Sequence, residues 1–594
     1  MANSGGDVAD DIFSGTSIIG PGEEGIGTDI QRVTTNSSST SHSDSSLAEK
    51  SVDPNIVTWS IGDPDDPKNW SKARRWWITI VCSTLSLSAT FSSSAPSAAT
   101  EAISQQFGTS TTSATLVTSL FLCGYVAGPL IWAPLSEMVG RRSIFLVTMF
   151  SFSVLQLGNA IGTTNLATIF AIRFLAGLFA AAPLTNCGGV IADIWDPVTR
   201  GKAITLFTAS TFIGPVMGPV IGNFIVSSFL GFRWVFWIMM ILSSASWLLA
   251  LFNLPETYAP ILLTRRAQKL RKATGNPMLH SLHEKVDFSL MGVLNRTIFR
   301  PFEMLATEPI LAMVTLYLSI VYGLLYAMLE AFPVIFTDTH GLTANETGLV
   351  FIGIGIGVVL GALLNLYLIR PIKELSIKWH GHPPCEIQLR GSMAAGPFLV
   401  AGIFWLGWSG AYRAVPWFVP ALATIFLGIS FTLLFISSQS YLIEVYLMYS
   451  ASALAANTIC RSAVGAAFPL FTRQMFNGMG IQWAATLLGL VSLVIAPSPF
   501  FFYKYGPRFR SGSKFAPALD LKLRATVQAE EKAAQLAPVD VSLNAEKRAT
   551  VTLHDRNLQQ SETNSDQSRA SSQLGLLVER EQHVERLSTA DVMV

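Results

Sequence analysis

Twelve apolar segments run through this sequence, and they restrict the folds open to the chain more than any other feature. A helix needs roughly 20 mostly apolar residues to cross about 30 Å of hydrocarbon. The pattern therefore predicts an all-α membrane protein with twelve transmembrane helices in two six-helix halves. The segments lie near residues 76–96, 113–134, 143–162, 166–190, 203–228, 234–254, 309–336, 347–369, 394–411, 416–440, 450–472 and 482–503.

Composition supports a membrane location. Half of the 594 residues are hydrophobic, only 13% are charged, and the mean hydropathy is +0.43. A soluble domain with this balance would expose large apolar patches. The net charge of +1 and the concentration of charges in the tails and one central stretch argue against a nucleic-acid partner.

A polar gap divides the twelve segments into six and six, the layout of transporters built from repeats. The run TTNSSSTSHSDSSL resembles a disordered tail, and no cleavable signal peptide is visible before the first segment. We expect a disordered cytoplasmic N-terminal tail (1–72), an N-terminal six-helix bundle (73–255), a central cytoplasmic loop (256–308), a C-terminal six-helix bundle (309–505) and a cytoplasmic C-terminal tail (506–594).

Basic residues set the expected orientation. They gather before the first segment, after the even-numbered segments and in the central gap, whereas the opposite flanks hold only Arg233, Arg413 and Arg473. By the positive-inside rule, both termini and the central loop are cytoplasmic.

The sequence offers no sign of enzyme chemistry. The five cysteines form no CxxC pair and no zinc spacing with histidine, and no Walker A, GxSxG or metal-helix motif is present. We expect no enzyme activity, no cofactor and no metal. Because ATP is not expected to drive transport directly, a proton gradient is the economical source of free energy.

The loop between the second and third segments reads PLSEMVGRR. Gly140 permits a tight turn, and Arg141 and Arg142 hold the loop on the cytoplasmic side. Glu137 lies one turn before the bend, where it can pair with a basic group or cap a neighbouring helix. A signal that only fixes topology would explain the arginines but not the PLSE run.

This loop resembles the signature of the major facilitator superfamily, Gly-x-Leu-x-Asp-Arg-x-Gly-Arg-Lys. Its PLSE…GRR form is similar to that of the fungal twelve-span drug:proton antiporters, and the resemblance covers about residues 59–510. The matching residues are Leu135, Gly140, Arg141 and Arg142, and the departures are Ala133 for the first Gly, Glu137 for Asp and Met138 for Arg.

Arg173 is a lone charge in the fourth segment. An arginine in an apolar helix costs at least about 2.5 kcal/mol on insertion, so it should face a polar cavity or a carboxylate. With Gly177 it matches part of the family's Arg-x-x-Gln-Gly signature, although Ala176 replaces Gln. The resemblance implies a role in proton coupling, and a buried structural pair is the alternative.

The fifth segment carries a glycine and proline pattern. Its three glycines recur at spacing four and so share one face that a second helix can approach closely, while its two prolines loosen the helix. A GxxxG pair alone would indicate only packing, but this longer run resembles the antiporter signature of exporters in the superfamily. The residues are Gly214, Pro215, Gly218, Pro219 and Gly222.

In the seventh segment, Tyr322, Tyr326 and Glu330 share one face at spacing four. Desolvation favours the protonated form of such a carboxyl group, which suits a proton carrier. Glu330 can equally lie near the outer surface as a gating residue. The run around Arg461 in the eleventh segment, ANTICRSAVGAAFPLFTRQMF, resembles that of the same subfamily. We interpret Arg461 as an anchor close to the cytoplasmic end.

These features predict a monomeric proton-coupled efflux transporter in the plasma membrane. It would export amphipathic organic compounds (drugs, toxins or secondary metabolites) in exchange for protons, by alternating access to a site between the halves. Export of polyamines or small organic acids, and facilitative import, are the alternatives. The expected partners are a small-molecule substrate, protons and the lipid bilayer.

Overall fold

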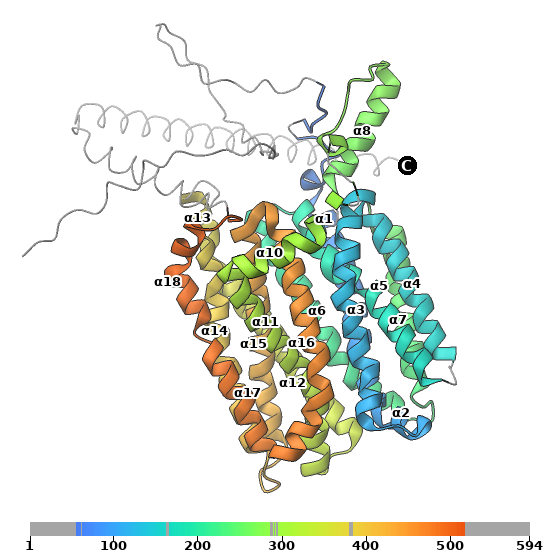
Figure 1. Ribbon diagram of the computed structural model, residues 1–594, viewed down its shortest axis with the longest axis vertical. Helices are drawn as coiled ribbons and strands as arrows, with labels where there is room; N and C mark the ends of the chain where they lie inside the picture. Colours follow the sequence, from blue (N-terminus) through green and yellow to red (C-terminus); the bar gives the residue numbers. More distant parts are fainter. Residues whose placement is uncertain are drawn as a thin grey trace, which may run out of the picture. The chain divides into compact units, whose positions relative to one another are not determined.

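Figure 1 shows the computed structural model of the chain. The structure describes residues 55–60, 62–161, 165–285, 289, 291–292, 295–378 and 384–516. The Ser-rich run and most of the two predicted tails lie outside the described residues. Within them the chain is helical, and the only β-type pairing is an isolated bridge between Ile56 and His280.

Twelve helices in the described part are long and apolar enough to cross a membrane, which confirms the predicted twelve spans. The first half holds α1 (Lys72–Ser94, extended by η2, Ala95–Ala99, and α2, Thr100–Phe107), α3 (Thr111–Val139), α4 (Arg141–Ile161), α5 (Leu166–Ile194), α6 (Pro197–Val226) and α7 (Arg233–Asn253). The second half holds α11 (Pro309–Phe332, extended by η5, Pro333–Thr339), α12 (Ala344–Leu368), α14 (Leu389–Gly410, preceded by η6, Cys385–Gln388), α15 (Phe418–Tyr446), α16 (Ser450–Met479) and α17 (Ile481–Ile495, followed by α18, Ser498–Ser511).

Several helices run past the apolar segments because polar caps, not hydropathy, set their ends. The Ser110 hydroxyl accepts a hydrogen bond from the backbone N–H of Ser113 at 3.2 Å and starts α3. Asn165 caps α5 in the same way at 2.9 Å. Thr343 and Glu346 form a reciprocal capping box at the start of α12.

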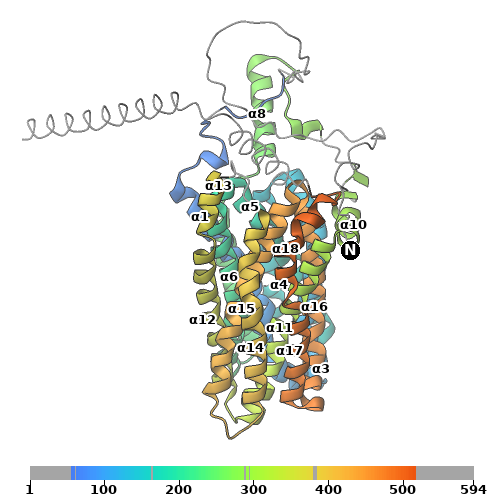
Figure 2. The same cartoon turned by 90° about the vertical axis from the view of Figure 1, so that its left-hand side faces the viewer.

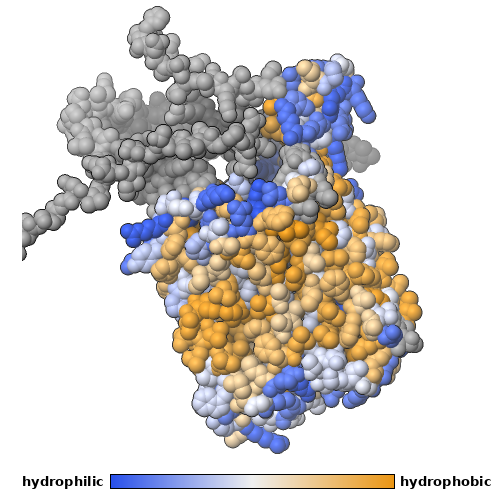
Figure 3. All heavy atoms as spheres, viewed as in Figure 1, coloured by the Kyte–Doolittle hydropathy of each residue, from blue (hydrophilic) through white to orange (hydrophobic). Residues whose placement is uncertain are grey.

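The outer surface is apolar around the middle of the bundle. Large side chains such as Val154, Ile241 and Ile356, each near the middle of its helix, are exposed there, and Figure 3 shows a broad hydrophobic zone between two more hydrophilic ends. A surface of this kind suits lipid rather than water.

Two helix pairs form the most extensive contacts between the halves. Helix α3 packs against α16, and α6 packs against α12 (Figures 1 and 2). Within the second half, α12 approaches α15 through Gly353, Gly357 and Gly361, and a Cβ at any of these positions would crowd α15. This glycine face is the counterpart of the one predicted for α6.

One end of the bundle carries α8 (Ala259–Thr274), which projects beyond the spans (Figure 1), and we call it the α8 end. Asp63, which precedes α1, forms an ion pair with Arg266 of α8. The Arg266 guanidinium holds the pKa of the Asp63 carboxyl below its ordinary value. Residues 55–72, assigned from sequence to the N-terminal tail, thus include a segment that packs on the loop after the sixth span.

The second half has its own polar cluster at this end. Arg510 of α18 is buried and donates to Glu386 at 2.6 Å. Ser513 donates to Glu308, just before α11, at 2.7 Å. In each half, polar contacts at the α8 end therefore join the segment before the first helix to the segment after the last one.

Candidate binding cavity between the two halves

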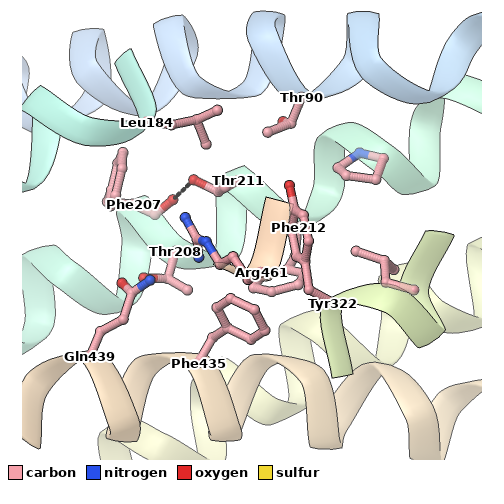
Figure 4. Close-up of a pocket in the computed structure, with 12 residues that line it drawn as sticks. Thr90, Leu184, Phe207, Thr208, Thr211, Phe212, Tyr322, Phe435, Gln439 and Arg461 are labelled. Carbon is pink, nitrogen blue, oxygen red and sulfur yellow. Dashed lines mark hydrogen bonds between the residues drawn. The ribbon is translucent and has the colours of Figure 1, made fainter. Parts of the chain in front are cut away.

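A cavity with about 450 Å³ of empty space lies between the halves. Helices α1, α5 and α6 of the first half and α11, α15 and α16 of the second supply its walls (Figure 4). The lining combines aromatic rings with threonine hydroxyls, one amide and one guanidinium. A concave, mostly apolar site with a few polar groups is the usual form of a small-molecule pocket.

The glycines of α6 place one wall of this cavity. A Cβ at Gly214 would overlap the Thr90 side chain of α1, and one at Gly218 would overlap Ser94. At Gly222, a Cβ would lie 2.8 Å from that of Ala98. The glycine face thus lets α6 touch α1 and η2.

The prolines of α6 lie away from this contact. Pro215 lines the cavity, and the carbonyl oxygen of Pro219 accepts a hydrogen bond from the Asn223 amide at 2.9 Å. Asn223 in turn borders Gly348 of α12. The five predicted residues of α6 are therefore divided between the α1 contact, the cavity and the contact with the second half.

The two tyrosines of α11 connect the cavity to the first half. Tyr322 lines the cavity, and its hydroxyl lies 3.5 Å from that of Tyr326. The Tyr326 hydroxyl lies 2.6 Å from the Ser93 hydroxyl of α1. The spacing of four places both rings on one face, as predicted, and that face meets the other half.

Arg461 of α16 lines the cavity, although the sequence analysis assigned it to the cytoplasmic end. Its side chain is 7% exposed, and its guanidinium carbon lies 5.3 Å from the ring centres of both Tyr322 and Phe435. Gly465, one turn along, leaves room for the Tyr322 ring. Arg461, like Arg173, is a lone arginine in an apolar helix and so needs a polar surrounding, which is the sequence signal for its place at the cavity.

Arg173 lies inside the first half and does not line the cavity. It is fully buried, and it donates to the carbonyl oxygens of Val117 and Ser92, each at 2.9 Å. Its guanidinium stacks on the Phe121 ring at 4.1 Å. These contacts join α1, α3 and α5.

Glu330 also lies outside the cavity lining, towards the end of the bundle opposite α8. It is 6% exposed and accepts a hydrogen bond from the Thr115 hydroxyl of α3 at 3.3 Å. Arg473 of α16 is within electrostatic range. Nearby, Gln474 and Thr112 are 2.7 Å apart, so polar contacts bridge the halves at this end.

The GRR loop is organised by a carboxylate that sequence reasoning missed. Gly140 adopts a φ of 106° between α3 and α4. The Glu256 carboxylate accepts hydrogen bonds from the backbone N–H groups of Arg141 at 3.0 Å and Arg142 at 3.3 Å. It therefore caps the N-terminus of α4, the role that the sequence analysis offered to Glu137.

Other contacts hold the rest of the loop signature. The Arg141 side chain reaches Asp193 at 3.4 Å and Ser136 at 2.8 Å. Leu135 is partly buried against the apolar core. Glu256 follows the sixth span and Asp193 lies near the end of the fourth. Both are far from the GRR loop in the sequence, so their contacts with it could not be predicted.

A second hollow of about 1340 Å³ adjoins the α8 end of the cavity walls. On α6, Ile204 of this hollow is one turn from Thr208 of the cavity. On α15, Ile443 is one turn from Gln439. The two spaces therefore follow one another along the same pair of helices, one from each half.

Among the described residues, no group of three or more His, Cys, Asp or Glu side chains could hold a metal ion. The fold and the cavity together are those of a polytopic membrane transporter in which two six-helix halves enclose a cavity with the usual form of a small-molecule pocket.

The chain belongs to the Major Facilitator Superfamily, whose sequence profile matches residues 80–469. It is 40% identical over 472 residues to the "Ascochitine biosynthesis cluster MFS transporter" of Didymella fabae, covering 79% of this chain and 90% of that protein. It is 36% identical over 473 residues to the "Major facilitator superfamily multidrug transporter mdrA" of Aspergillus fumigatus, covering 80% and 77%. The resemblance to fungal efflux members of the superfamily is thereby confirmed.

Solved structures support the fold. A proton:xylose symporter of the superfamily matches with a TM-score of 0.54 and 18% identity, covering 73% of this chain and 96% of the symporter. At this identity the match shows the shared helical architecture.

Proposed function

We propose that this protein is a proton-coupled efflux transporter, working as a monomer, that exports amphipathic organic compounds across the plasma membrane by alternating access. The observation that carries the proposal is the cavity between the halves, with its aromatic and hydroxyl lining. Apolar walls tolerate substrates of many shapes, while a few polar groups orient them.

Basic residues support an orientation with the α8 end and both termini in the cytosol. Arg265, Arg266 and Lys269 of α8 and Arg508 and Arg510 of α18 are all at this end. The positive-inside rule places such ends on the cytosolic side. In this orientation the second hollow is a cytosolic vestibule that leads to the cavity.

Two observations favour export. The α6 glycine and proline run, which resembles the antiporter signature of exporters, packs against α1 and borders the cavity. Relatives are named as transporters of the ascochitine and citrinin biosynthesis clusters and as a multidrug transporter. Drugs, toxins or secondary metabolites are therefore the proposed cargo.

Glu330 is the proposed proton carrier. Its carboxyl group is buried between the halves, where Thr115 donates to it and Arg473 is near. A change in its charge would alter contacts among α3, α11 and α16, which come from opposite halves. Protonation could in this way shift the balance between two arrangements of the halves.

The test is efflux of a fluorescent amphipathic dye from cells that express the protein, with and without a protonophore, while cellular ATP is held constant. We expect uphill efflux to stop when the proton gradient is dissipated. Continued uphill efflux would refute proton coupling. Equal rates in both directions without a gradient would indicate a facilitative carrier.

A further inference from the structure

We propose that the cavity selects amphipathic organic anions, holding a carboxylate or a similar acidic group on the Arg461 guanidinium and an aromatic body between the surrounding rings. This inference rests on the proposed function, because it takes the cavity to be the substrate site. It narrows the cargo from amphipathic compounds in general to one charge class.

The placement of Arg461 is the first support. Arg461 is only 7% exposed, and Figure 4 shows its guanidinium projecting into the space that the lining residues surround. Tyr322 and Phe435 lie 5.3 Å from it and hold it by cation–π contacts. Ring contacts of this kind leave N–H groups of the planar fork free for an oxyanion.

The missing counter-charge is the second support. None of the lining residues is acidic, and in the described part of the chain no carboxylate forms an ion pair with Arg461. Its electrostatic neighbours are the hydroxyls of Tyr322, Tyr326 and Tyr125. Its Nε has no hydrogen-bond partner, and neither has the hydroxyl of Thr208 in the same cavity.

Other buried arginines of this protein differ from Arg461. Arg510 donates to the Glu386 carboxylate at 2.6 Å, Arg141 reaches Asp193 at 3.4 Å, and Arg173 donates to two backbone carbonyls. Buried arginines are normally satisfied in such ways. Arg461 has no such partner among the described residues, so its guanidinium is available to a ligand in the cavity.

The remaining lining fits the apolar part of such a ligand. Phe207, Phe212, Leu184 and Leu325 offer apolar surface, and the Phe212 and Phe435 rings meet edge to face at 4.7 Å. A compound with an aromatic body and one acidic group matches the polarity of this lining.

Other charge classes fit less well. A cationic substrate, including a polyamine, would meet the Arg461 charge in a site of low dielectric constant. A neutral substrate without an acceptor would leave the Arg461 Nε buried and unbonded. Only a ligand with a hydrogen-bond acceptor, and best an ionised one, can bond to the Arg461 guanidinium.

The vestibule is consistent with the same charge class. Arg200, Lys202 and Arg370 line it, against a single acidic residue, Glu444, which accepts from Gln388 at 2.5 Å. A passage lined mainly by one sign of charge raises the local concentration of oppositely charged ligands. Anions in the cytosol would therefore be drawn towards the cavity.

The test compares binding of two xanthene dyes to the purified full-length protein in detergent by fluorescence anisotropy, with no proton gradient present. Fluorescein is an anion with a free carboxylate. Tetramethylrhodamine methyl ester is a cation whose carboxyl group is esterified. The variants are Arg461→Gln, Arg461→Lys and, as a charge-matched control, Arg233→Gln, because Arg233 is exposed at the far end.

We expect wild type and Arg233→Gln to bind fluorescein at least about tenfold more tightly than the cationic ester. Arg461→Gln should lose this preference while still binding the ester, which also shows that it is folded. Arg461→Lys should retain a reduced preference, because a point charge replaces the fork. Should Arg461→Gln fail to fold, the wild-type preference and the lysine variant decide the question.

Equal affinity of wild type for both dyes, a preference for the cation, or an unchanged preference in Arg461→Gln would overturn the proposal. Its failure is separate from that of the proposed function. Loss of proton-dependent efflux with intact anion preference would refute the coupling, whereas proton-dependent efflux of both dyes at equal rates would refute only the charge selectivity.

Discussion

The two halves of the protein each bury a lone arginine in a span, and they use it differently. Arg173 in the first half donates to two backbone carbonyls and joins three helices. Arg461 in the second half rests on two rings and faces the cavity. A buried charge in a membrane helix thus indicates function only once its partners are known. The Nε and Nη2 groups of Arg173 donate within its own half and only its Nη1 has no partner, whereas Arg461 forms no hydrogen bond with the described residues.

The largest expected effect comes from removing Arg173, the charge that is hydrogen-bonded within its own half. Arg173→Gln should leave the carbonyl of Val117 or Ser92 without a donor and lower the stability of the protein by about 3 kcal/mol. The measurement is the thermal unfolding of purified protein. Arg173→Lys should recover part of the loss, and Arg233→Gln should match wild type. An unaltered melting temperature in Arg173→Gln would mean that Arg173 is not a structural link.

Arg461→Gln should show the opposite pattern. Efflux of fluorescein from cells should fall about ten- to a hundredfold, because an ionised partner is lost from the cavity. The melting temperature should equal or exceed that of wild type, because an unpaired buried charge is removed. A marked loss of stability would place Arg461 in the same structural class as Arg173 and remove the contrast.

Glu330 belongs to the second half and contacts the first, so its substitution tests the coupling between them. Glu330→Gln mimics the protonated carboxyl group. We expect substrate binding to remain within about twofold of wild type, while efflux loses its dependence on external pH, because the residue can no longer bind and release a proton. Glu101→Gln, an exposed carboxylate near the same end, should keep the wild-type profile. An unchanged pH profile in Glu330→Gln would leave Glu330 as a gating or substrate residue.

The smallest effect is expected at the α8 end. Arg266 lowers the pKa of Asp63 from its ordinary value of 3.8, so this ion pair stabilises the fold above that value and is lost only as the pH falls through the lowered pKa. Asp63→Asn should speed amide hydrogen exchange of residues 55–70 a few-fold at neutral pH and leave efflux unchanged. The pair Glu303 and Lys514 offers a control, since Glu303→Gln should not affect that segment.

The fold could be predicted from the sequence because the bilayer imposes a simple length requirement on every span. The ends were less accurate, since caps such as Ser110 and Asn165 lie outside the apolar windows. The predicted depth of a residue in the membrane was inaccurate for the same reason. Arg461 lies eleven residues after the first residue of α16, Ser450, which at 1.5 Å per residue is roughly 17 Å, about half of the hydrocarbon thickness and not its edge.

The pairing of side chains from different helices could not be predicted. Spacing placed Tyr322, Tyr326 and Glu330 on one face, but it gave no sign that Ser93 and Thr115 lie opposite them. The same holds for Glu256 at the start of α4, which is more than a hundred residues away in the sequence. Such contacts depend on how helices pack, and one sequence carries no direct record of that.

The bare guanidinium of Arg461 also has an electrical consequence. On the proposed cycle, the loaded cavity holds a cation and an anion and is neutral, whereas the empty cavity carries a positive charge. With Glu330 protonated and neutral, the substrate-free transporter carries the Arg461 charge on its return, so this step responds to membrane voltage, at up to about 2.3 kcal/mol per charge for each 100 mV. An inside-negative potential would hasten that return, so a polarised cell would turn the transporter over faster than a depolarised one at the same proton gradient.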